Sequence, residues 1–154
     1  MLRRILAVAA LVALSAVPAQ AQIPLLDIRA GLHGALPQGD FADSHDVGIG
    51  AYFRAGAPLL VVKMMGSVTY TQFKAANPLT DDVSELTLQV GPHFSPIPLL
   101  DLGAEFAYMT DAEEWAFSPN VSVGFMMLEA TASYNKPFQS GASSWVTLGL
   151  GFRF

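Results

Sequence analysis

The last eleven residues of the chain, Ser144 to Phe154, read SWVTLGLGFRF and alternate strictly between two kinds of side chain. Successive side chains of an extended strand point to opposite faces, so the alternation separates the two kinds. One face is wholly apolar and consists of Val146, Leu148, Leu150, Phe152 and Phe154. Chain ends are usually exposed and frayed, which makes an apolar strand costly there in a water-soluble protein. We therefore expect a strand whose apolar face does not meet water.

The same alternation recurs along the chain and predicts eight strands, at residues 25–36, 47–55, 59–73, 84–94, 99–109, 117–126, 128–135 and 144–154. Longer polar loops at 37–46, 74–83, 110–116 and 136–143 alternate with short turns. Breaker residues place these turns at Gly56-Ala57-Pro58, at Ser95-Pro96-Ile97-Pro98 and around Met126-Met127. Pro92 and Pro119 lack the backbone N–H that a ladder needs, and we expect a bulge or a strand end at each.

The first 21 residues have the organisation of a secretory signal peptide. Arg3 and Arg4 precede an apolar run over 5–17, and Ala19-Gln20-Ala21 is a small-residue cleavage site. The alternative, a membrane anchor, would need about 20 apolar residues to span as a helix. We expect export, cleavage after residue 21, and a single domain over residues 22–154.

Composition narrows the class of protein further. Beyond residue 21 there are six basic and 13 acidic residues, a formal charge of −7, which argues against a nucleic-acid partner. There is no cysteine, so disulfides and thiolate metal sites are impossible. Although 52% of the chain is hydrophobic and only 14% is charged, no segment beyond residue 21 reaches 18 consecutive apolar residues. Short alternating strands in an apolar, exported chain are typical of a membrane β-barrel.

The alternative is a water-soluble barrel of the lipocalin type, with its apolar face inside. Two features argue against it. The polar face carries many glycines, which suit a crowded interior, and these are Gly31, Gly48, Gly50, Gly91, Gly103, Gly124, Gly149 and Gly151. Aromatic residues of the apolar face are expected in two bands, as at membrane interfaces: Tyr70, Tyr108, Tyr134 and Phe117 toward the loops, and Phe53, Phe125, Phe152 and Phe154 toward the turns.

With this pattern the chain resembles the small eight-stranded bacterial outer-membrane barrels, such as the transmembrane domain of OmpA and OmpX. The resemblance covers residues 22–154, and its most specific part is the C-terminal insertion signal at Val146, Leu148, Leu150, Phe152 and Phe154. It implies an all-β fold, an eight-stranded antiparallel up-and-down transmembrane barrel in the cell outer membrane. It also implies contact with outer-membrane lipids and lipopolysaccharide, insertion by the barrel-assembly machinery through the C-terminal strand, and a monomeric state.

Charged residues of the inward face gather in the half of the barrel nearest the turns. They are Asp27, Arg29, Arg54, Lys63, Asp101, Glu105, Glu129 and Arg153, four basic and four acidic. A buried charge is costly unless it is paired, so this balance predicts a salt-bridge network that fills the barrel. His93 is expected to join it through hydrogen bonds. The alternative is an ion pathway, although eight strands leave an interior only wide enough for side chains.

Catalytic and metal sites are weakly indicated. His33 and Glu85 are expected near the rim with several hydroxyls, yet the His-x-Ser motif of the lipid A deacylases is absent. Ser44-His45-Asp46 has the composition of a triad, but adjacent residues rarely converge in the required geometry. Acidic outer loops could hold divalent cations, although their spacing fits no EF-hand loop. We therefore predict no catalytic residue, no cofactor and no metal site. The expected function is structural or surface-interacting and non-enzymatic, with a lipid A-modifying enzyme or a narrow channel as alternatives.

Overall fold

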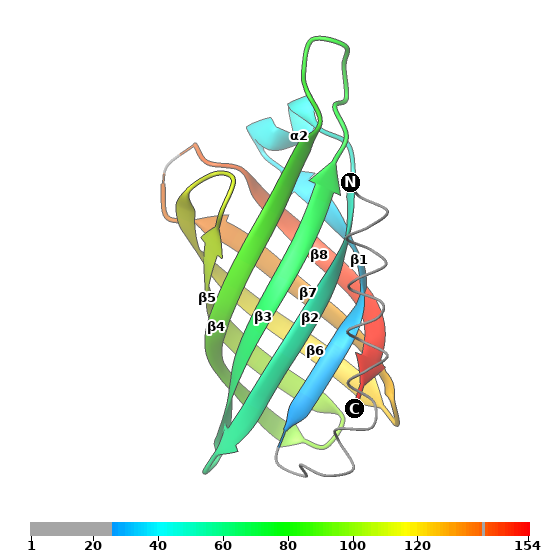
Figure 1. Cartoon of the computed structure of the whole chain (residues 1–154), viewed down its shortest axis with the longest axis vertical. Coiled ribbons are helices and arrows are strands. Elements are labelled where there is room, and N and C mark those ends of the chain that lie inside the picture. Colours follow the sequence, from blue (N-terminus) through cyan, green and yellow to red (C-terminus); the bar gives the residue numbers. More distant parts are fainter. Residues whose placement is uncertain (1–25, 140) are drawn as a thin grey trace.

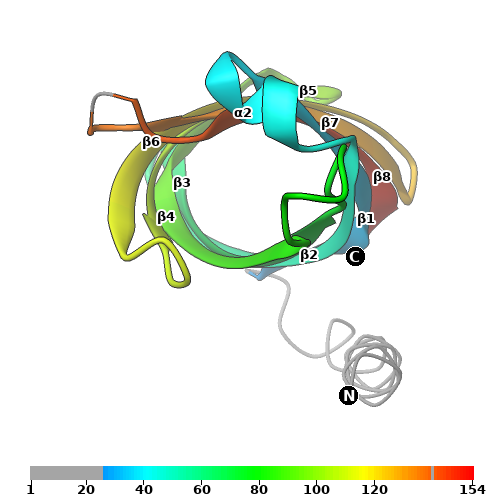
Figure 2. The same cartoon turned by 90° about the horizontal axis from the view of Figure 1, so that it is seen from above.

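The computed structural model describes residues 26–139 and 141–154, which form eight strands and one short helix (Figure 1). The elements are β1 (Asp27–Gln38), α2 (Asp40–Ser44), β2 (Gly48–Leu59), β3 (Val62–Phe73), β4 (Val83–Ile97), β5 (Leu100–Met109), β6 (Glu114–Phe125), β7 (Leu128–Pro137) and β8 (Ser144–Arg153). Each strand pairs antiparallel with its neighbours in sequence, and β8 pairs with β1 to close the barrel (Figure 2). The predicted fold is confirmed. The expected signal peptide at residues 1–21 lies outside the described residues.

The two ends of the barrel differ. Four longer connections, including the one that carries α2, lie at one end, which we call the loop end (Figure 1). Two-residue turns join the strands at the other, the turn end, at Leu60-Val61, Pro98-Leu99 and Met126-Met127. The helix α2 lies over the rim of the loop end (Figure 2). It is tied to the next loop by backbone hydrogen bonds from Asp46 to Lys74 (2.9 Å) and from Ala76 to Ser44 (3.0 Å).

Two of the predicted turns are wrong in position. The chain passes through Gly56 and Pro58 as a strand, and it turns at Leu60-Val61 instead. Gly56 is needed inside the barrel, because a Cβ there would lie 3.1 Å from the Cα of Met65. Pro58 lies beyond the described pairing of β2 with β1, so its missing N–H leaves that ladder intact. Similarly, β4 continues to Ile97, and the irregular stretch between Phe94 and Ile97 is a register shift within the β4–β5 ladder.

The predicted bulges or strand ends at Pro92 and Pro119 are also wrong. Each proline lies inside a continuous strand and pairs with one neighbour, Pro92 with Met64 and Pro119 with Ala104. The ladder with the other neighbour skips the proline but resumes in the same register. A proline removes only one donor, and a strand held on its opposite edge tolerates that loss.

Apolar and polar side chains are distributed inversely to those of a water-soluble protein. Outward-pointing apolar residues are exposed on every strand, for example Ile49 (71%), Phe106 (55%) and Leu150 (73%). Inward-pointing charged residues are buried, with Arg29 and Glu105 both at 0% exposure. Large contiguous apolar surfaces of this kind are not found on water-soluble monomers. The core that holds the barrel together is therefore polar over most of its length.

Candidate functional site

Arg29 is the centre of an ion-pair network near the turn end. Its side chain is fully buried, and its guanidinium donates to three carboxylates from three strands. The distances are 2.9 Å to Asp27, 2.8 Å to Asp101 and 2.6 Å to Glu129. The planar guanidinium presents five N–H donors in fixed directions, which suits it to bind several carboxylates at once. Arg29 thus links β1, β5 and β7 across the barrel interior.

Further cations complete this network. Lys63 contacts both Asp27 (2.9 Å) and Asp101, and Arg153 of the last strand donates to Asp27 (2.9 Å). His93 joins from β4 and bonds Asp101 through Nδ1 (2.6 Å) and Glu105 through Nε2 (3.0 Å). Six of the eight charged residues expected in the interior are thus joined directly, and Glu105 is joined through His93.

Arg54 is the predicted member that the structure does not bring into the network. It is buried, and its Nε and Nη1 atoms have no hydrogen-bond partner among the described residues. Its guanidinium lies over the ring of Tyr52, 5.2 Å from the ring centroid. Arg54 pairs with Arg29 across the β1–β2 ladder, yet it lines a small cavity among uncharged polar residues of the middle of the barrel.

The middle of the barrel is filled by uncharged polar side chains. Gln89 bonds Ser67 (2.8 Å), Ser118 (3.2 Å) and Asn135 (3.1 Å) from three different strands. Between this layer, His33 and Arg54, the free space amounts to a cavity of only about 10 Å³. One water molecule needs roughly 10–15 Å³ measured in this way. The free space at this level of the barrel therefore has room for about one water molecule at most.

Six buried inward residues near the loop end are apolar, which the sequence pattern did not indicate. This apolar layer consists of Ala35, Phe73, Ala107, Met109, Ala116 and Trp145, and Phe41 of α2 packs against it. Phe73 is in edge-on contact with both Phe41 and Trp145, at centroid distances of 5.0 Å and 5.4 Å. The alternation of each strand was read correctly, but the change from polar to apolar along the inward face becomes visible only once the register aligns the strand ends.

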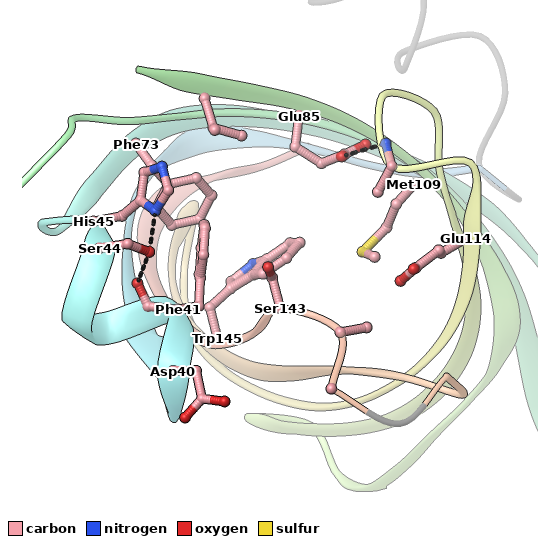
Figure 3. A pocket seen from close by; sticks show the side chains of 14 residues that line it. Asp40, Phe41, Ser44, His45, Phe73, Glu85, Met109, Glu114, Ser143 and Trp145 are labelled. Atoms are coloured by element: carbon pink, nitrogen blue, oxygen red, sulfur yellow. Dashed lines mark hydrogen bonds between the residues drawn. The ribbon is translucent and has the colours of Figure 1, made fainter. Parts of the chain in front are cut away.

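A cavity of about 430 Å³ opens above the apolar layer, which we call the mouth cavity (Figure 3). Its walls come from α2, from the strand ends of β3, β4, β5, β6 and β8, and from residues 141–143. Three carboxylates line it, those of Asp40, Glu85 and Glu114. The Glu85 side chain is buried and accepts backbone hydrogen bonds from Asp111 (3.2 Å) and Ala112 (3.1 Å).

The groups that sequence reasoning weighed for catalysis lie in two separate places. His33 bonds Thr71 (2.9 Å) inside the barrel, whereas Glu85 bonds the 110–113 connection at the mouth cavity. In the loop, His45 Nε2 donates to the backbone carbonyl of Asp81 (3.3 Å), and its Nδ1 is hydrogen-bonded to Ser44 Oγ (2.8 Å), which also donates to the carbonyl of Phe41 (3.2 Å). A backbone carbonyl thus occupies the place where a triad has its carboxylate, and Asp46 is exposed.

The outward aromatic residues form the two expected bands with one correction. Phe117 lies toward the loop end, and Phe125 and Phe152 lie toward the turn end, all exposed. Phe53 was expected at the turn end, but β2 extends to Leu59 and leaves it at mid-strand. Trp115 adds to the loop-end band and packs on Tyr108, with ring centroids 5.1 Å apart.

Because β7 extends to Pro137, Lys136 also lies on the outward face, at the loop end.

The residues expected to form a C-terminal insertion signal occupy the outward face of β8. Leu148, Leu150 and Phe152 are more than half exposed, and Val146 lies nearest the loop end. Phe154 follows the last strand residue and stacks with Phe152 at 6.5 Å. The backbone N–H of Phe154 donates to the carbonyl of Ile28 (2.8 Å), so pairing with β1 continues past the end of β8.

Within residues 26–139 and 141–154, no group of three or more His, Asp or Glu side chains is arranged to hold a metal ion. In the same part of the chain, no helix is both long enough and apolar enough to cross a membrane.

Comparison with known proteins identifies the architecture but no family. No protein-family model and no curated protein sequence matches the chain. Among solved structures it is similar to the Yersinia pestis outer membrane protein Ail, with a TM-score of 0.58, 13% identity, and coverage of 84% of this chain and 99% of that one. Neisserial surface protein A aligns with a TM-score of 0.51 and 15% identity over 83% and 95% of the two chains. A designed transmembrane β-barrel aligns with a TM-score of 0.57 and 12% identity, over 83% of this chain and 95% of the designed one.

At these identities the similarity establishes the fold alone. The chain has the architecture of small eight-stranded transmembrane barrels, one of which was built with no biological role to conserve. An architecture shared by a designed barrel, an outer membrane protein and a surface protein does not assign an activity. Any function must therefore be argued from the outward face, the filled interior and the loop end of this chain.

Proposed function

We propose that this chain is a non-enzymatic integral protein of the bacterial outer membrane, with a structural or surface-interaction role. The observation that carries the proposal is the inverted distribution of side chains, with an exposed apolar band around a barrel filled by buried charges. In hydrocarbon every backbone polar group needs an internal partner, and a closed barrel provides one for all eight strands. Lipid is the environment in which this outward face is stable.

The choice of the outer membrane is supported by the sequence and by the fold. A signal peptide over residues 1–21 would direct export, and the alternating C-terminal strand is the feature expected for insertion. The similar proteins from Yersinia pestis and Neisseria are named as an outer membrane protein and a surface protein. Short turns at one end and longer loops at the other match the periplasmic and external ends of such barrels. The loop end, with α2, would then face the cell exterior.

A surface role is favoured over catalysis because many inward hydroxyl and amide groups are hydrogen-bonded to one another. The side chains of Ser67, Gln89, Asn135 and Thr147 bond within the barrel, away from any lipid substrate. Ser44 and His45 form a hydrogen-bonded pair, but the second histidine nitrogen is held by a main-chain carbonyl. The loop end, by contrast, combines an ordered helix, acidic loops and an open cavity, which are the features of a surface that binds.

Cell fractionation with gel electrophoresis tests the membrane assignment. We expect the processed protein in the outer-membrane fraction, and we expect it to migrate faster before boiling than after, as a barrel that resists detergent. A processed protein that appears in the soluble periplasmic fraction would contradict the proposal. Leu150→Asp, which introduces a charge on the exposed face of β8, should reduce the membrane-inserted fraction, whereas Asp46→Asn in a loop should not.

Mass spectrometry of lipid A tests the non-enzymatic part separately. Lipid A from cells that overproduce the protein is compared with lipid A from cells that carry an empty vector. We expect identical acyl-chain profiles. A gained or lost acyl chain that disappears in Ser44→Ala or His33→Ala would show that the protein is an enzyme and would leave its membrane location unaffected.

A further inference from the structure

The α2 side of the mouth cavity is held against the barrel by aromatic packing and hydrogen bonds. Phe41, on the five-residue helix α2, packs against Phe73 and Trp145 of the barrel, with centroids 5.0 Å and 6.4 Å away. The α2 loop is also held by the backbone hydrogen bonds that join residues 44 and 46 to residues 74 and 76. A volume of about 430 Å³ falls within the range of small-molecule sites, about 300–1,000 Å³. A ligand there would meet a preformed surface, which reduces the ordering cost of binding.

One part of this surface is aromatic. The rings of Phe41, Phe73 and Trp145 form a continuous cluster, and all three residues line the cavity (Figure 3). Aromatic faces carry negative electrostatic potential, and Trp binds a cation more strongly than Phe or Tyr does. The cluster therefore offers contact both to an apolar body and to a positive charge.

The remaining wall is anionic. Figure 3 shows the Glu85 and Glu114 side chains on one side of Trp145 and Asp40 on another. The lining residues of the mouth cavity include no lysine and no arginine. Glu85 is 4% exposed, and each of its oxygens accepts one backbone N–H, which fixes the carboxylate in place. A carboxylate offers about four acceptor positions, so Glu85 keeps capacity for a ligand donor.

We propose that the mouth cavity binds a small organic cation, an ammonium group carried on an apolar body. The ammonium group would lie between the carboxylates of Glu85 and Glu114, and the apolar body would rest on the cluster formed by Phe41, Phe73 and Trp145. An anionic ligand would face three carboxylates without a compensating cation. A neutral apolar ligand would leave the buried carboxylate of Glu85 without a counter-ion. This inference goes beyond the proposed membrane role and does not depend on which membrane holds the barrel.

Tryptophan fluorescence can test the site directly, because the chain has two tryptophans and only Trp145 lines the cavity. Trp115→Phe removes the outward tryptophan and leaves Trp145 as the reporter. The full barrel, folded in a nonionic detergent, is titrated with 2-phenylethylammonium. Its neutral isostere 2-phenylethanol and the anion 3-phenylpropanoate are titrated in parallel. We expect a saturable change with the cation, about tenfold weaker binding of the alcohol, and no saturation with the anion.

Charge variants locate the binding within the molecule. In the Trp115→Phe background, Glu85→Gln and Glu114→Gln should each weaken the apparent Kd for 2-phenylethylammonium by about tenfold. Asp46→Asn is the matched control, because it removes the same charge from an exposed position of the same loop end outside the cavity lining. If Glu85→Gln does not fold, Glu114→Gln alone carries the comparison.

Three results would overturn the inference. They are equal affinity for the cation and the alcohol, an equal loss of affinity in Asp46→Asn and Glu114→Gln, or a linear, non-saturating response to the cation. The first would indicate an apolar site, the second a general effect of surface charge, and the third partition of the probe into detergent.

Discussion

Two buried arginines inside the same barrel have opposite surroundings. Arg29 is bound by three carboxylates, whereas Arg54 lies over an aromatic ring with two of its nitrogens unpartnered among the described residues. Removal of one partner from a buried ion pair costs far more than the pair itself contributes, because the remaining charges stay buried. Although Arg29 and Arg54 carry the same charge and are both buried, their replacement should therefore change the free energy of unfolding by very different amounts.

Arg29→Met should lower the free energy of unfolding by about 3–5 kcal/mol, because three carboxylates would lose their common partner. Arg54→Met should change it by less than about 1 kcal/mol or stabilise the barrel, since no carboxylate pairs with Arg54 among the described residues. Both values come from urea titration in lipid vesicles, followed by tryptophan fluorescence. Similar losses in the two variants would mean that Arg54 has a charged partner in the membrane-embedded protein.

At the residue scale, the sequence predicted which charged residues face the interior better than it predicted which ion pairs they form. Alternation and charge balance placed eight charged residues on the inward face, because the period of a strand fixes the face of each side chain. Which carboxylate each cation reaches depends on the register between strands, and no single strand carries that information. Arg54 was therefore grouped with Arg29, its partner across the β1–β2 ladder, although only Arg29 reaches carboxylates among the described residues.

At Gly91 the close approach of β4 and β5 depends on the absence of a side chain. A Cβ at Gly91 would lie 2.7 Å from the Cα of Glu105 and 2.9 Å from the carbonyl carbon of Ala104, which are backbone atoms that cannot move aside. At Gly34 the nearest atom to an added Cβ is 3.9 Å away. The two glycines thus allow a matched comparison within one barrel.

Gly91→Ala should destabilise the barrel by about 1–3 kcal/mol, because β4 and β5 would have to separate. Gly34→Ala should be neutral within about 0.5 kcal/mol. Urea midpoints of the two variants, measured under identical conditions, decide the matter. Equal stability of Gly91→Ala and the unchanged protein would show that β4 and β5 are further apart than in this structure.

Turn positions show where local signals mislead. Gly56 and Pro58 are strong breakers in isolation, but in this barrel the glycine relieves crowding and the proline lies past the end of a pairing. The true turn at Leu60-Val61 contains no breaker, and Leu60 adopts a positive φ of 58°. Register over the whole β2–β3 hairpin outweighs the preference of single residues, so the hairpin is longer than the breakers suggested.

The last strand, β8, is the element that closes the barrel and carries the expected insertion signal. Combined Phe152→Ala and Phe154→Ala should reduce the amount of heat-modifiable protein in the outer membrane of cells several-fold. Refolding of the purified variant into detergent should remain efficient, because neither ring contributes to the interior. Phe106→Ala with Phe125→Ala, which removes two exposed rings from other strands, is the control and should assemble normally. Equal defects in both pairs would make general apolarity, rather than a terminal signal, the requirement.

At the scale of the whole molecule, three layers lie in series between the two ends. The ion-pair network, the uncharged polar layer and the apolar layer follow one another from the turn end to the loop end, and the free space beside Arg54 is about 10 Å³. Barrel closure followed from the sequence. The apolar layer and the mouth cavity did not, because they form where α2 and six strand ends meet, far apart along the chain.

This layered interior predicts that the barrel does not conduct ions. In planar bilayers we expect no steady conductance from the purified protein, with a porin prepared in the same way as the positive control. Trp145→Ala should also remain closed, because it opens the apolar layer but leaves the network around Arg29 intact. Arg29→Ala, by contrast, frees the carboxylates of Asp27, Asp101 and Glu129 and should give at most brief openings, since the uncharged layer persists. A stable open state in the unchanged protein, altered by Arg29→Ala or Glu105→Ala, would identify the interior as an ion pathway and would replace the filled-core interpretation.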